Sequence, residues 1–385
     1  MPDRTRNKKN IPYSRQYIDN DDIRHVVNVL KSDFLTQGPA VEEFEKKIAA
    51  YCDTKYAVAF ISGTAALHGA CYTAGIGQGD EVITTPLTFA ATANSVLYCK
   101  GTVVFADIRN DLPLIDPAEI ERKITRKTKA IIPVDYSGIP ADYNEIRAIA
   151  KKRGLVVIGD AAHSLGATYK GKKVGSCADM TMLSFHPVKA ITTGEGGMIV
   201  TDNKKYYEKL KTFRSHGITK EKKFFKNGDQ GLWYHEMQDL GFNYRLTDIQ
   251  AALGISQLKK IDSFIKKRSS IAKQYTDMFK TFTPIEIIKV PLDRESAWHL
   301  FPIRIKRVKN KKMIAKKFHD RGIGVQVHYI PTHLHPYYGE QFGYKRYDFP
   351  LSERFYDEEL SLPLYPTMTK EDIKRVVFET KSILS

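Results

Sequence analysis

The sequence predicts an α/β fold in which a seven-stranded, mostly parallel sheet is followed by a smaller C-terminal α+β unit. Short apolar runs bounded by turn residues indicate the strands, at 56–60, 81–85, 102–107, 130–136, 155–160, 180–185 and 197–202. Segments with helical spacing of apolar residues separate most of these runs, at 65–73, 90–100, 117–124 and 143–153. Such alternation is typical of a parallel sheet covered on both faces.

The seventh strand is predicted to be antiparallel to the sixth. Only residues 185–196 join the two runs, and this segment has no helical period. A crossover between parallel strands needs a dozen or more residues and usually a helix. The short connection therefore favours a chain reversal.

The C-terminal part is expected to begin with one long amphipathic helix over 246–279, which links two domains. An irregular polar stretch, 220–244, precedes it. The smaller unit should then contain strands at 298–305 and 323–330 and helices at 311–321 and 370–384. We therefore divide the chain into a basic tail with the segment leading into the fold (1–20), a large domain (21–250) and a small domain with the linking helix (251–385).

Composition excludes several classes of protein. No apolar run approaches the length of a membrane span, and the first ten residues lack the apolar core of a secretory signal, so we expect a cytoplasmic protein without membrane contact. Four scattered cysteines suggest neither a disulfide scaffold nor a zinc ribbon. The net charge of +16 fits solvated lysine-rich faces, steering of an anionic substrate or nucleic acid. No nucleic-acid motif accompanies the charge, so we expect no such partner.

Several candidate site residues lie where a predicted helix begins or a predicted strand ends. Ser62, Gly63 and Thr64 start the helix after the first strand, where free N–H groups favour an anion, although serine and threonine are also common helix caps. Asp160 ends the fifth strand, where open α/β sheets bind ligands. An aspartate there can also simply cap the next turn.

Three further residues follow strand ends. Phe89 could stack on a flat ligand or pack in the core, and His163 could contact a ring hydroxyl or be structural. Lys189, in SFHPVKAITTGEGG, could be a phosphate clamp, a solvated charge or a covalent catalyst. The P-loop motif G-x-x-x-x-G-K-[ST] is absent, which argues against the clamp.

These features together match the requirements of pyridoxal 5′-phosphate (PLP). A lysine can bond covalently to the cofactor, a carboxylate can keep its ring nitrogen protonated, and a helix start can bind its phosphate. We expect no metal site, because the H-x-H pattern of His333 and His335 lacks a third ligand motif and is interpreted as a surface loop at a domain junction.

The sequence resembles the DegT family of nucleotide-sugar aminotransferases, which are PLP enzymes of fold type I with an aspartate-aminotransferase-like fold. The resemblance covers nearly the whole chain. It is carried by LTQGPAVEEFE (35–45), SGTAAL (62–67), GDEVITTPLTFAATAN (79–94), GDAAHSLGA (159–167), SFHPVKAITTGEGG (184–197), FRSHG (213–217), GFNYRLTDIQAALG (241–254) and VHYIPTH (327–333).

The resemblance implies roles for individual residues. Lys189 matches the lysine that bonds to the cofactor, Asp160 the partner of the ring nitrogen, and His163 the contact of the ring hydroxyl. Many relatives have glutamine in place of His163, so the histidine departs from the commonest pattern. The expected catalytic residues are Lys189 and Asp160.

The remaining cofactor contacts are implied in the same way. Gly63 and Thr64, with Ser62 beside them, and Ser184 match phosphate contacts, and Phe89 matches the aromatic residue that stacks on the ring. Asn243 matches a phosphate ligand donated by a neighbouring subunit. The resemblance therefore implies a homodimer with shared active sites.

Within the family, VDYSGIP (134–140), SFHPVKAITTGEGG, FRSHG and VQVHYIP are most similar to the transaminases of pseudaminic-acid biosynthesis. This subgroup aminates C4 of UDP-2-acetamido-2,6-dideoxy-β-L-arabino-hexos-4-ulose with L-glutamate. Lys31, Arg214 and His328 are candidates for contact with the UDP-sugar. Two alternatives stay open: an aminotransferase for another UDP-, dTDP- or GDP-4-keto-6-deoxy sugar, and a non-catalytic, cofactor-binding regulatory protein.

Overall fold

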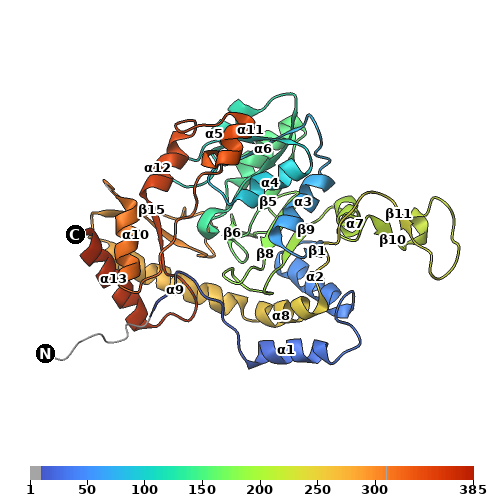
Figure 1. The fold of residues 1–385 in the computed structure, drawn as a ribbon, viewed down its shortest axis with the longest axis horizontal. Coiled ribbons are helices and arrows are strands. Elements are labelled where there is room, and N and C mark those ends of the chain that lie inside the picture. The colour runs from blue at the N-terminus through green and yellow to red at the C-terminus, as the bar shows by residue number, and fades with distance from the viewer. Residues whose placement is uncertain (1–9, 309) are drawn as a thin grey trace.

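The central sheet has the seven strands that the sequence predicts (Figure 1). The computed structural model describes residues 10–308 and 310–385, so positions 1–9 of the predicted basic tail lie outside the described residues. In spatial order the sheet contains β1 (Tyr56–Phe60), β9 (Gly197–Thr201), β8 (Met180–Ser184), β5 (Val156–Asp160), β4 (Thr128–Ile132), β2 (Glu81–Thr84) and β3 (Thr102–Phe105).

The predicted reversal of the last strand is confirmed. β9 pairs antiparallel with both β8 and β1, with Ser184 opposite Gly197 and Phe60 opposite Gly197. The other neighbouring strands of this sheet pair parallel. A Cβ atom on Gly197 would lie 2.4 Å from the carbonyl oxygen of Ser62. Only glycine therefore lets β9 pass the start of the helix that begins at Gly63.

Helices cover both faces of the sheet, because the strands bury both sets of side chains. In β1, Val58 and Phe60 pack towards one face, while Ala57 and Ala59 pack towards the other. The first face is covered by α3 (Gly63–Thr73), α4 (Ala90–Tyr98) and α7 (Lys204–Phe213). The second face is covered by α2 (Pro39–Tyr51), α5 (Pro117–Lys123), α6 (Tyr143–Arg153) and α8 (Asp248–Leu258).

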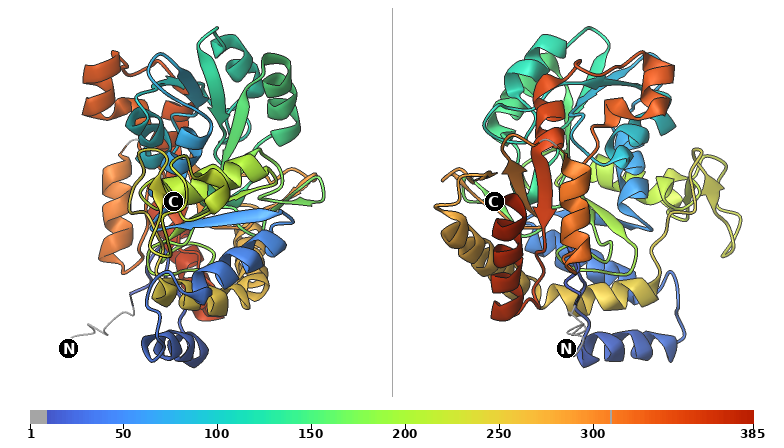
Figure 2. Two further views of the ribbon diagram at one scale, coloured as in Figure 1. Left: turned by 90° about the vertical axis from the view of Figure 1, so that its right-hand side faces the viewer. Right: turned by 60° about the vertical axis from the view of Figure 1, so that its left-hand side comes forward.

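The prediction of one long helix over 246–279 is wrong. The chain forms α8 and then α9 (Ile261–Phe279), with a break at Lys259 and Lys260. α8 packs against α2 and against the outermost helix α1 (Asn20–Leu30), whereas α9 continues into the core of the C-terminal unit (Figures 1 and 2). Lys260 is held at the break by Asp19 and Asp22, at 2.6 and 2.9 Å. The break is invisible in the sequence because apolar residues continue at helical spacing on both sides.

The C-terminal unit contains a three-stranded antiparallel sheet of β12 (Ile285–Ile287), β14 (Phe301–Ile305) and β15 (Glu359–Leu362). Its core is formed with α9, α10 (Lys311–Asp320) and α13 (Lys370–Leu384). β14 is shorter than the predicted 298–305, because Trp298 has φ of 49°, which an extended strand cannot accommodate. β12 and β15 were not predicted.

The predicted strand at 323–330 is also wrong. Only isolated bridges form there, from Ile323 to Ile11 and from Gln326 to Ser361. The backbone N–H of His328 donates to a carboxylate oxygen of Glu359, at 2.9 Å, instead of to a strand carbonyl. The side chains at 326–330 line a cavity, which explains why an apolar, β-branched sequence does not extend the sheet here.

The segment after residue 330 returns to the large domain. It contains a 3₁₀ turn (Thr332–Leu334), α11 (Pro336–Phe342) and α12 (Pro350–Glu358). Tyr338 and Phe349 are buried beside Phe105 of β3, so this segment packs against the seven-stranded sheet. His333 is buried and bonds to Glu353 at 3.0 Å, so the interpretation of the H-x-H pattern as a surface loop is wrong for this residue.

An arm projects from the body between α7 and α8 (Figures 1 and 2). It contains β10 (Ile218–Thr219), a 3₁₀ turn (Lys222–Phe224) and β11 (Glu236–Met237). A separate small sheet joins β6 (Thr168–Tyr169), β7 (Lys172–Lys173) and β13 (Arg294–Glu295). A further 3₁₀ turn (Tyr136–Gly138) follows β4. Within the described ranges, none of the helices has the length and apolar character needed to cross a membrane.

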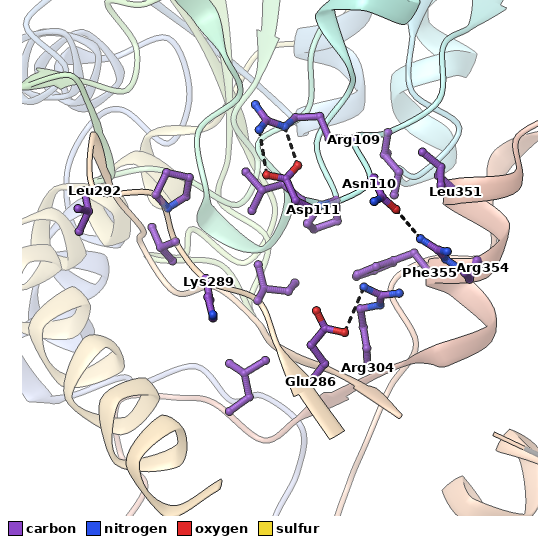
Figure 3. Close-up of a pocket in the computed structure, with 17 residues that line it drawn as sticks. Arg109, Asn110, Asp111, Glu286, Lys289, Leu292, Arg304, Leu351, Arg354 and Phe355 are labelled. Carbon is purple, nitrogen blue, oxygen red and sulfur yellow. Dashed lines mark hydrogen bonds and ion pairs between the residues drawn. The ribbon is translucent and has the colours of Figure 1, made fainter. Parts of the chain in front are cut away.

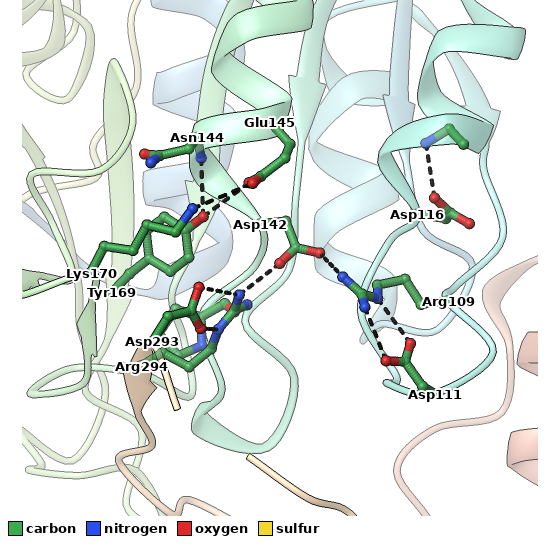
Figure 4. Close-up of polar contacts among 12 residues, drawn as sticks. Arg109, Asp111, Asp116, Asp142, Asn144, Glu145, Tyr169, Lys170, Asp293 and Arg294 are labelled. Carbon is green, nitrogen blue, oxygen red and sulfur yellow. Dashed lines mark hydrogen bonds and ion pairs between the residues drawn. The ribbon is translucent and has the colours of Figure 1, made fainter. Parts of the chain in front are cut away.

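A buried charge cluster ties the strand β13 to the large domain (Figure 4). The carboxylate of Asp142 contacts Arg294 at 2.8 Å and Arg109 at 2.7 Å, and the side chains of Asp142 and Arg294 are 5% and 4% exposed. Arg294 also donates to the carbonyl of Pro140 at 2.7 Å. Removing one partner of a buried pair leaves the other charge without compensation.

We expect Asp142→Asn to lower the free energy of unfolding by about 3 kcal/mol, because Arg294 and Arg109 lose their shared carboxylate. Chemical denaturation measures this change. Asp320→Ala removes an exposed ion pair with Lys316 and should cost less than about 1 kcal/mol. Equal effects of the two variants would contradict the prediction.

Candidate active site

A cavity of about 720 Å³ opens at the carboxyl ends of β5 and β8. Its walls come from the start of α3, the loop before α4, the ends of the two strands and the segment 326–330. It brings together nine predicted site residues: Ser62, Gly63, Thr64, Phe89, Asp160, His163, Ser184, Lys189 and His328.

The start of α3 forms a cradle for an anion. Ser62 is the N-cap, and its side-chain oxygen accepts the N–H of Ala65 at 3.1 Å. A Cβ atom on Gly63 would lie 3.4 Å from the Cβ atom of Ser184, so glycine leaves room between the helix start and the end of β8. The helix N-terminus with the hydroxyls of Thr64 and Ser184 fits a phosphate group.

Asp160 supplies a buried carboxylate at the floor of the cavity. It is 5% exposed and accepts hydrogen bonds from the Thr92 hydroxyl at 2.7 Å and from the N–H of Ala162 at 3.2 Å. Burial raises its pKa, while the Thr92 hydroxyl, the Ala162 N–H and the charge of Lys189 lower it. A protonated ring nitrogen would pair with this carboxylate and further favour its charged form.

Lys189 lies in the loop after β8 and is half-buried. Burial lowers the pKa of its amine to about 8, although the charge of Asp160 acts in the opposite direction. Roughly a tenth of an amine with this pKa is neutral at pH 7. The nitrogen is 3.5 Å from Nε2 of His299, and the side chain lines the cavity, so Lys189 is not a solvated surface charge.

His163 offers an unpartnered nitrogen to a ligand. Its Nε2 bonds to the hydroxyl of Tyr329 at 2.9 Å, while its Nδ1 is buried and has no partner among the described residues. Burial and the nearby charges of Lys189 and His328 hold the pKa of His163 well below its usual value, so the ring is neutral. Because buried polar atoms are seldom left unpaired, a ligand hydroxyl fits this position.

Phe89 is 61% exposed although it lines the cavity. Its ring centroid is 6.0 Å from that of Tyr329. A large aromatic side chain with this exposure is not packed in the core, which favours stacking on a flat ligand. The anion cradle, the buried carboxylate, the free histidine nitrogen and the exposed ring therefore all fit PLP.

The sequence profile of the DegT/DnrJ/EryC1/StrS aminotransferase family matches residues 16–380. The chain belongs to this family. A UDP-4-amino-4,6-dideoxy-N-acetyl-β-L-altrosamine transaminase of Campylobacter jejuni is 41% identical over 379 residues, which cover 97% of either protein. The family assignment from the sequence is thus confirmed.

Solved aminotransferase structures share the fold. Helicobacter pylori PseC, an aminotransferase involved in the biosynthesis of pseudaminic acid, superposes with a TM-score of 0.91 and is 35% identical, covering 98% of this chain and 99% of PseC. Streptococcus pneumoniae Spr1654 in its PLP-form has a TM-score of 0.91 and 31% identity, covering 97% of this chain and 98% of that protein. The same protein was also solved in a PMP-form.

The other predicted contacts of this aminotransferase do not line the cavity of the same chain. Lys31 is exposed at the end of α1, and Asn243 is exposed at the base of the arm. Arg214 forms an ion pair with Glu45 and donates to the carbonyl of Ala59 at 2.8 Å. These internal bonds occupy the guanidinium group and do not favour Arg214 as a contact of the substrate.

A second cavity, of about 500 Å³, lies where the segment 286–292 faces the loop 108–113 (Figure 3). Its arginines are bonded within the protein: Arg109 to Asp111, Arg304 to Glu286 and Glu358, and Arg354 to Asn110. The three arginines are thus held by bonds within the protein, whereas Lys289 also lines the cavity.

Three residues of the site were not predicted from the sequence. Thr92 lies in TFAATAN, on the first turn of α4, and its spacing from Phe89 is a signal that could have been used. Tyr329 follows the predicted His328 directly. His299 carried no signal, because it reaches Lys189 from a segment more than a hundred residues later in the chain.

Proposed function

We propose that this aminotransferase transfers an amino group from L-glutamate to C4 of UDP-2-acetamido-2,6-dideoxy-β-L-arabino-hexos-4-ulose, with PLP as cofactor. The products are 2-oxoglutarate and UDP-4-amino-4,6-dideoxy-N-acetyl-β-L-altrosamine. The observation that carries the chemistry is the placement of Lys189 and Asp160 in one cavity with the anion cradle of α3. The substrate is supported by relatives named for this reaction, at 41% and 38% identity.

Bound PLP would supply an electron sink next to the carbon that loses a proton. The protein moves that proton. The neutral amine of Lys189 would take a proton from the α-carbon of glutamate and, as an ammonium, give it to the bound cofactor. In the second half-reaction the amine would take a proton back from the cofactor and deliver it to C4 of the sugar. A base must be neutral to act, and the pKa of about 8 places a usable fraction of Lys189 in that form.

The surrounding residues hold the reactants in place. Asp160 would pair with the ring nitrogen, and the Thr92 hydroxyl orients the carboxylate. Phe89 would stack on the ring, and Thr64, Ser184 and the N–H groups of α3 would bind the phosphate. Of the three residues predicted to contact the sugar nucleotide, only His328 lines this cavity. Its Nδ1 bonds to the Ser361 hydroxyl at 2.9 Å.

The substrate assignment is tested by incubating the purified protein with PLP, glutamate and a panel of UDP-, dTDP- and GDP-4-keto-6-deoxy sugars. We expect NMR of the products to show amination at C4 of the UDP-sugar, with 2-oxoglutarate formed in equal amount. Amination of only a dTDP- or GDP-sugar would establish the alternative substrate class. Absence of any amination would favour a non-catalytic regulatory protein.

We further propose that the enzyme works in the cytoplasm as a homodimer in which Asn243 completes the partner's phosphate site. Its four cysteines are free thiols, as in proteins of a reducing compartment. Asn243 lies between Phe242 and Tyr244, whose rings stack at 4.8 Å, so its backbone position is fixed. The nearby arm exposes apolar residues, Leu232, Trp233, Met237 and Leu240, which is typical of a surface that binds another subunit.

Mixing two defective variants tests the shared site. Lys189→Arg and Asn243→Ala homodimers should each have low activity. After joint refolding, a heterodimer has one site with both defects and one site with neither, so about a quarter of the wild-type activity should return. A mixture no more active than the mean of its components, or a monomer in sedimentation, would contradict the proposal.

A further inference from the structure

His299 places an imidazole ring against the amine of Lys189. The side chain is 4% exposed, and its Nε2 is 3.5 Å from Nζ of Lys189. It lines the same cavity as the cofactor-site residues. It reaches that cavity from the segment just before β14, on the side where the C-terminal unit meets the large domain.

The backbone at His299 is held from the large domain. Its N–H donates to the carbonyl of Ser137 at 3.0 Å, and the N–H of Ala297 donates to the carbonyl of Gly138 at 3.0 Å. The approach is so close that a Cβ atom on Gly138 would lie 2.8 Å from the nitrogen of Trp298. These bonds fix the point from which the imidazole extends.

Arg268 of α9 holds the same segment from the other side. Its guanidinium donates to the carbonyls of His299 at 3.2 Å and Leu364 at 2.9 Å, and its Nε is buried without a partner among the described residues. Burial lowers the pKa of Arg268 to about 10, which still leaves it charged at neutral pH. The result is a buried cation behind His299.

The environment keeps the ring of His299 neutral. Burial, and the cost of a further positive charge beside Lys189 and Arg268, hold its pKa well below the usual value. The ring centroid is 4.3 Å from that of His163, which restricts its rotation. A neutral imidazole has one nitrogen that accepts a hydrogen bond, and the nitrogen facing an amine that donates is Nε2.

We propose that His299 is a positioning residue for Lys189: its Nε2 accepts a hydrogen from the amine and turns the nitrogen's lone pair towards the reacting carbon. This inference rests on the proposed transamination. His299 is too weak a base to take the substrate proton itself, so it acts through Lys189. It also stabilises the amine after protonation, because its acceptor nitrogen favours the charged form, as does the charge of Asp160.

The charge state of Lys189 gives a test that needs no turnover. In the full-length protein, with and without pyridoxamine phosphate, labelling of amines by acetic anhydride across a pH series reports the pKa of Lys189 by mass spectrometry. We expect His299→Phe, which keeps an aromatic ring against His163, to lower the midpoint by about one pH unit, because the ammonium loses an acceptor. His299→Gln, whose amide oxygen can replace Nε2, should restore it.

The same two variants of His299 should also differ in their kinetic constants for glutamate. His299→Phe should lower kcat for the glutamate half-reaction about tenfold, with KM for glutamate changed less than about twofold, and His299→Gln should recover most of the loss. His333→Phe removes another buried histidine, one that bonds to Glu353 and does not line the cavity, and should change neither the labelling midpoint nor kcat and KM for glutamate.

The proposal is overturned if His299→Phe labels Lys189 with the wild-type midpoint, or if the phenylalanine and glutamine variants behave alike. These outcomes are distinct from a failure of the proposed function. If no keto sugar and no glutamate were converted, the labelling would still show whether His299 controls the amine. If turnover were normal and labelling unchanged, only the role of His299 would be lost.

Discussion

Replacing Lys189 with arginine should lower kcat for both half-reactions by roughly 10⁴-fold, because the variant loses the base that moves the proton. Arginine keeps the positive charge and the length of the side chain, but its guanidinium stays protonated at working pH. The visible absorbance of the covalently bound cofactor should disappear as well. Single-turnover kinetics with glutamate and absorbance spectra measure the two effects.

The pH dependence follows from the same amine. Because the pKa of Lys189 is lowered to about 8, the rate of amination of the keto sugar by protein loaded with pyridoxamine phosphate should rise with pH and level off above about 8. The sign is fixed, since acid protonates the base. Lys273→Arg, at an exposed ion pair with Asp277, is a matched control and should leave rate and profile unchanged. A fully active Lys189→Arg variant would exclude the assignment.

The sheet could be predicted because its strands are buried on both faces. Runs such as 57–60 and 156–158 are apolar throughout. These strands end at one edge of the sheet. The position of Asp160, Lys189 and the start of α3 at that edge could therefore be predicted without knowing any side-chain contact. The short link after β8 was enough to predict that β9 runs antiparallel.

The predictions that were wrong concern elements whose structure depends on contacts between residues far apart in the sequence. The apolar period continues through Lys259 and Lys260, so only the different neighbours of α8 and α9 reveal the break. The segment 323–330 has the composition of a strand, but its backbone is engaged by Glu359 and by the cavity. His299 and Tyr329 reach the site from the C-terminal unit, and no spacing along the chain reports such a contact.

Asp160→Ala should lower kcat by roughly 10³-fold while the protein still binds some cofactor. The carboxylate is what keeps the ring nitrogen protonated, and a neutral ring accepts electrons poorly. The phosphate cradle at Gly63 and Ser184 does not involve Asp160, so binding should weaken less than catalysis. Cofactor retention by absorbance and single-turnover rates with glutamate measure the two effects separately.

Thr92→Val provides a graded comparison. The Thr92 hydroxyl donates to Asp160 at 2.7 Å and is one of the groups that lower the pKa of this buried carboxyl. Without that bond the pKa of Asp160 should rise, so more of it is protonated at neutral pH, and kcat should fall about tenfold. Because deprotonation restores the carboxylate, the loss of activity should shrink as pH increases.

Two outcomes would contradict these predictions. Native single-turnover rates in the Asp160→Ala variant would remove Asp160 from the mechanism. A loss of activity in Thr92→Val that did not depend on pH would remove only the role of the Thr92 hydroxyl in keeping Asp160 charged.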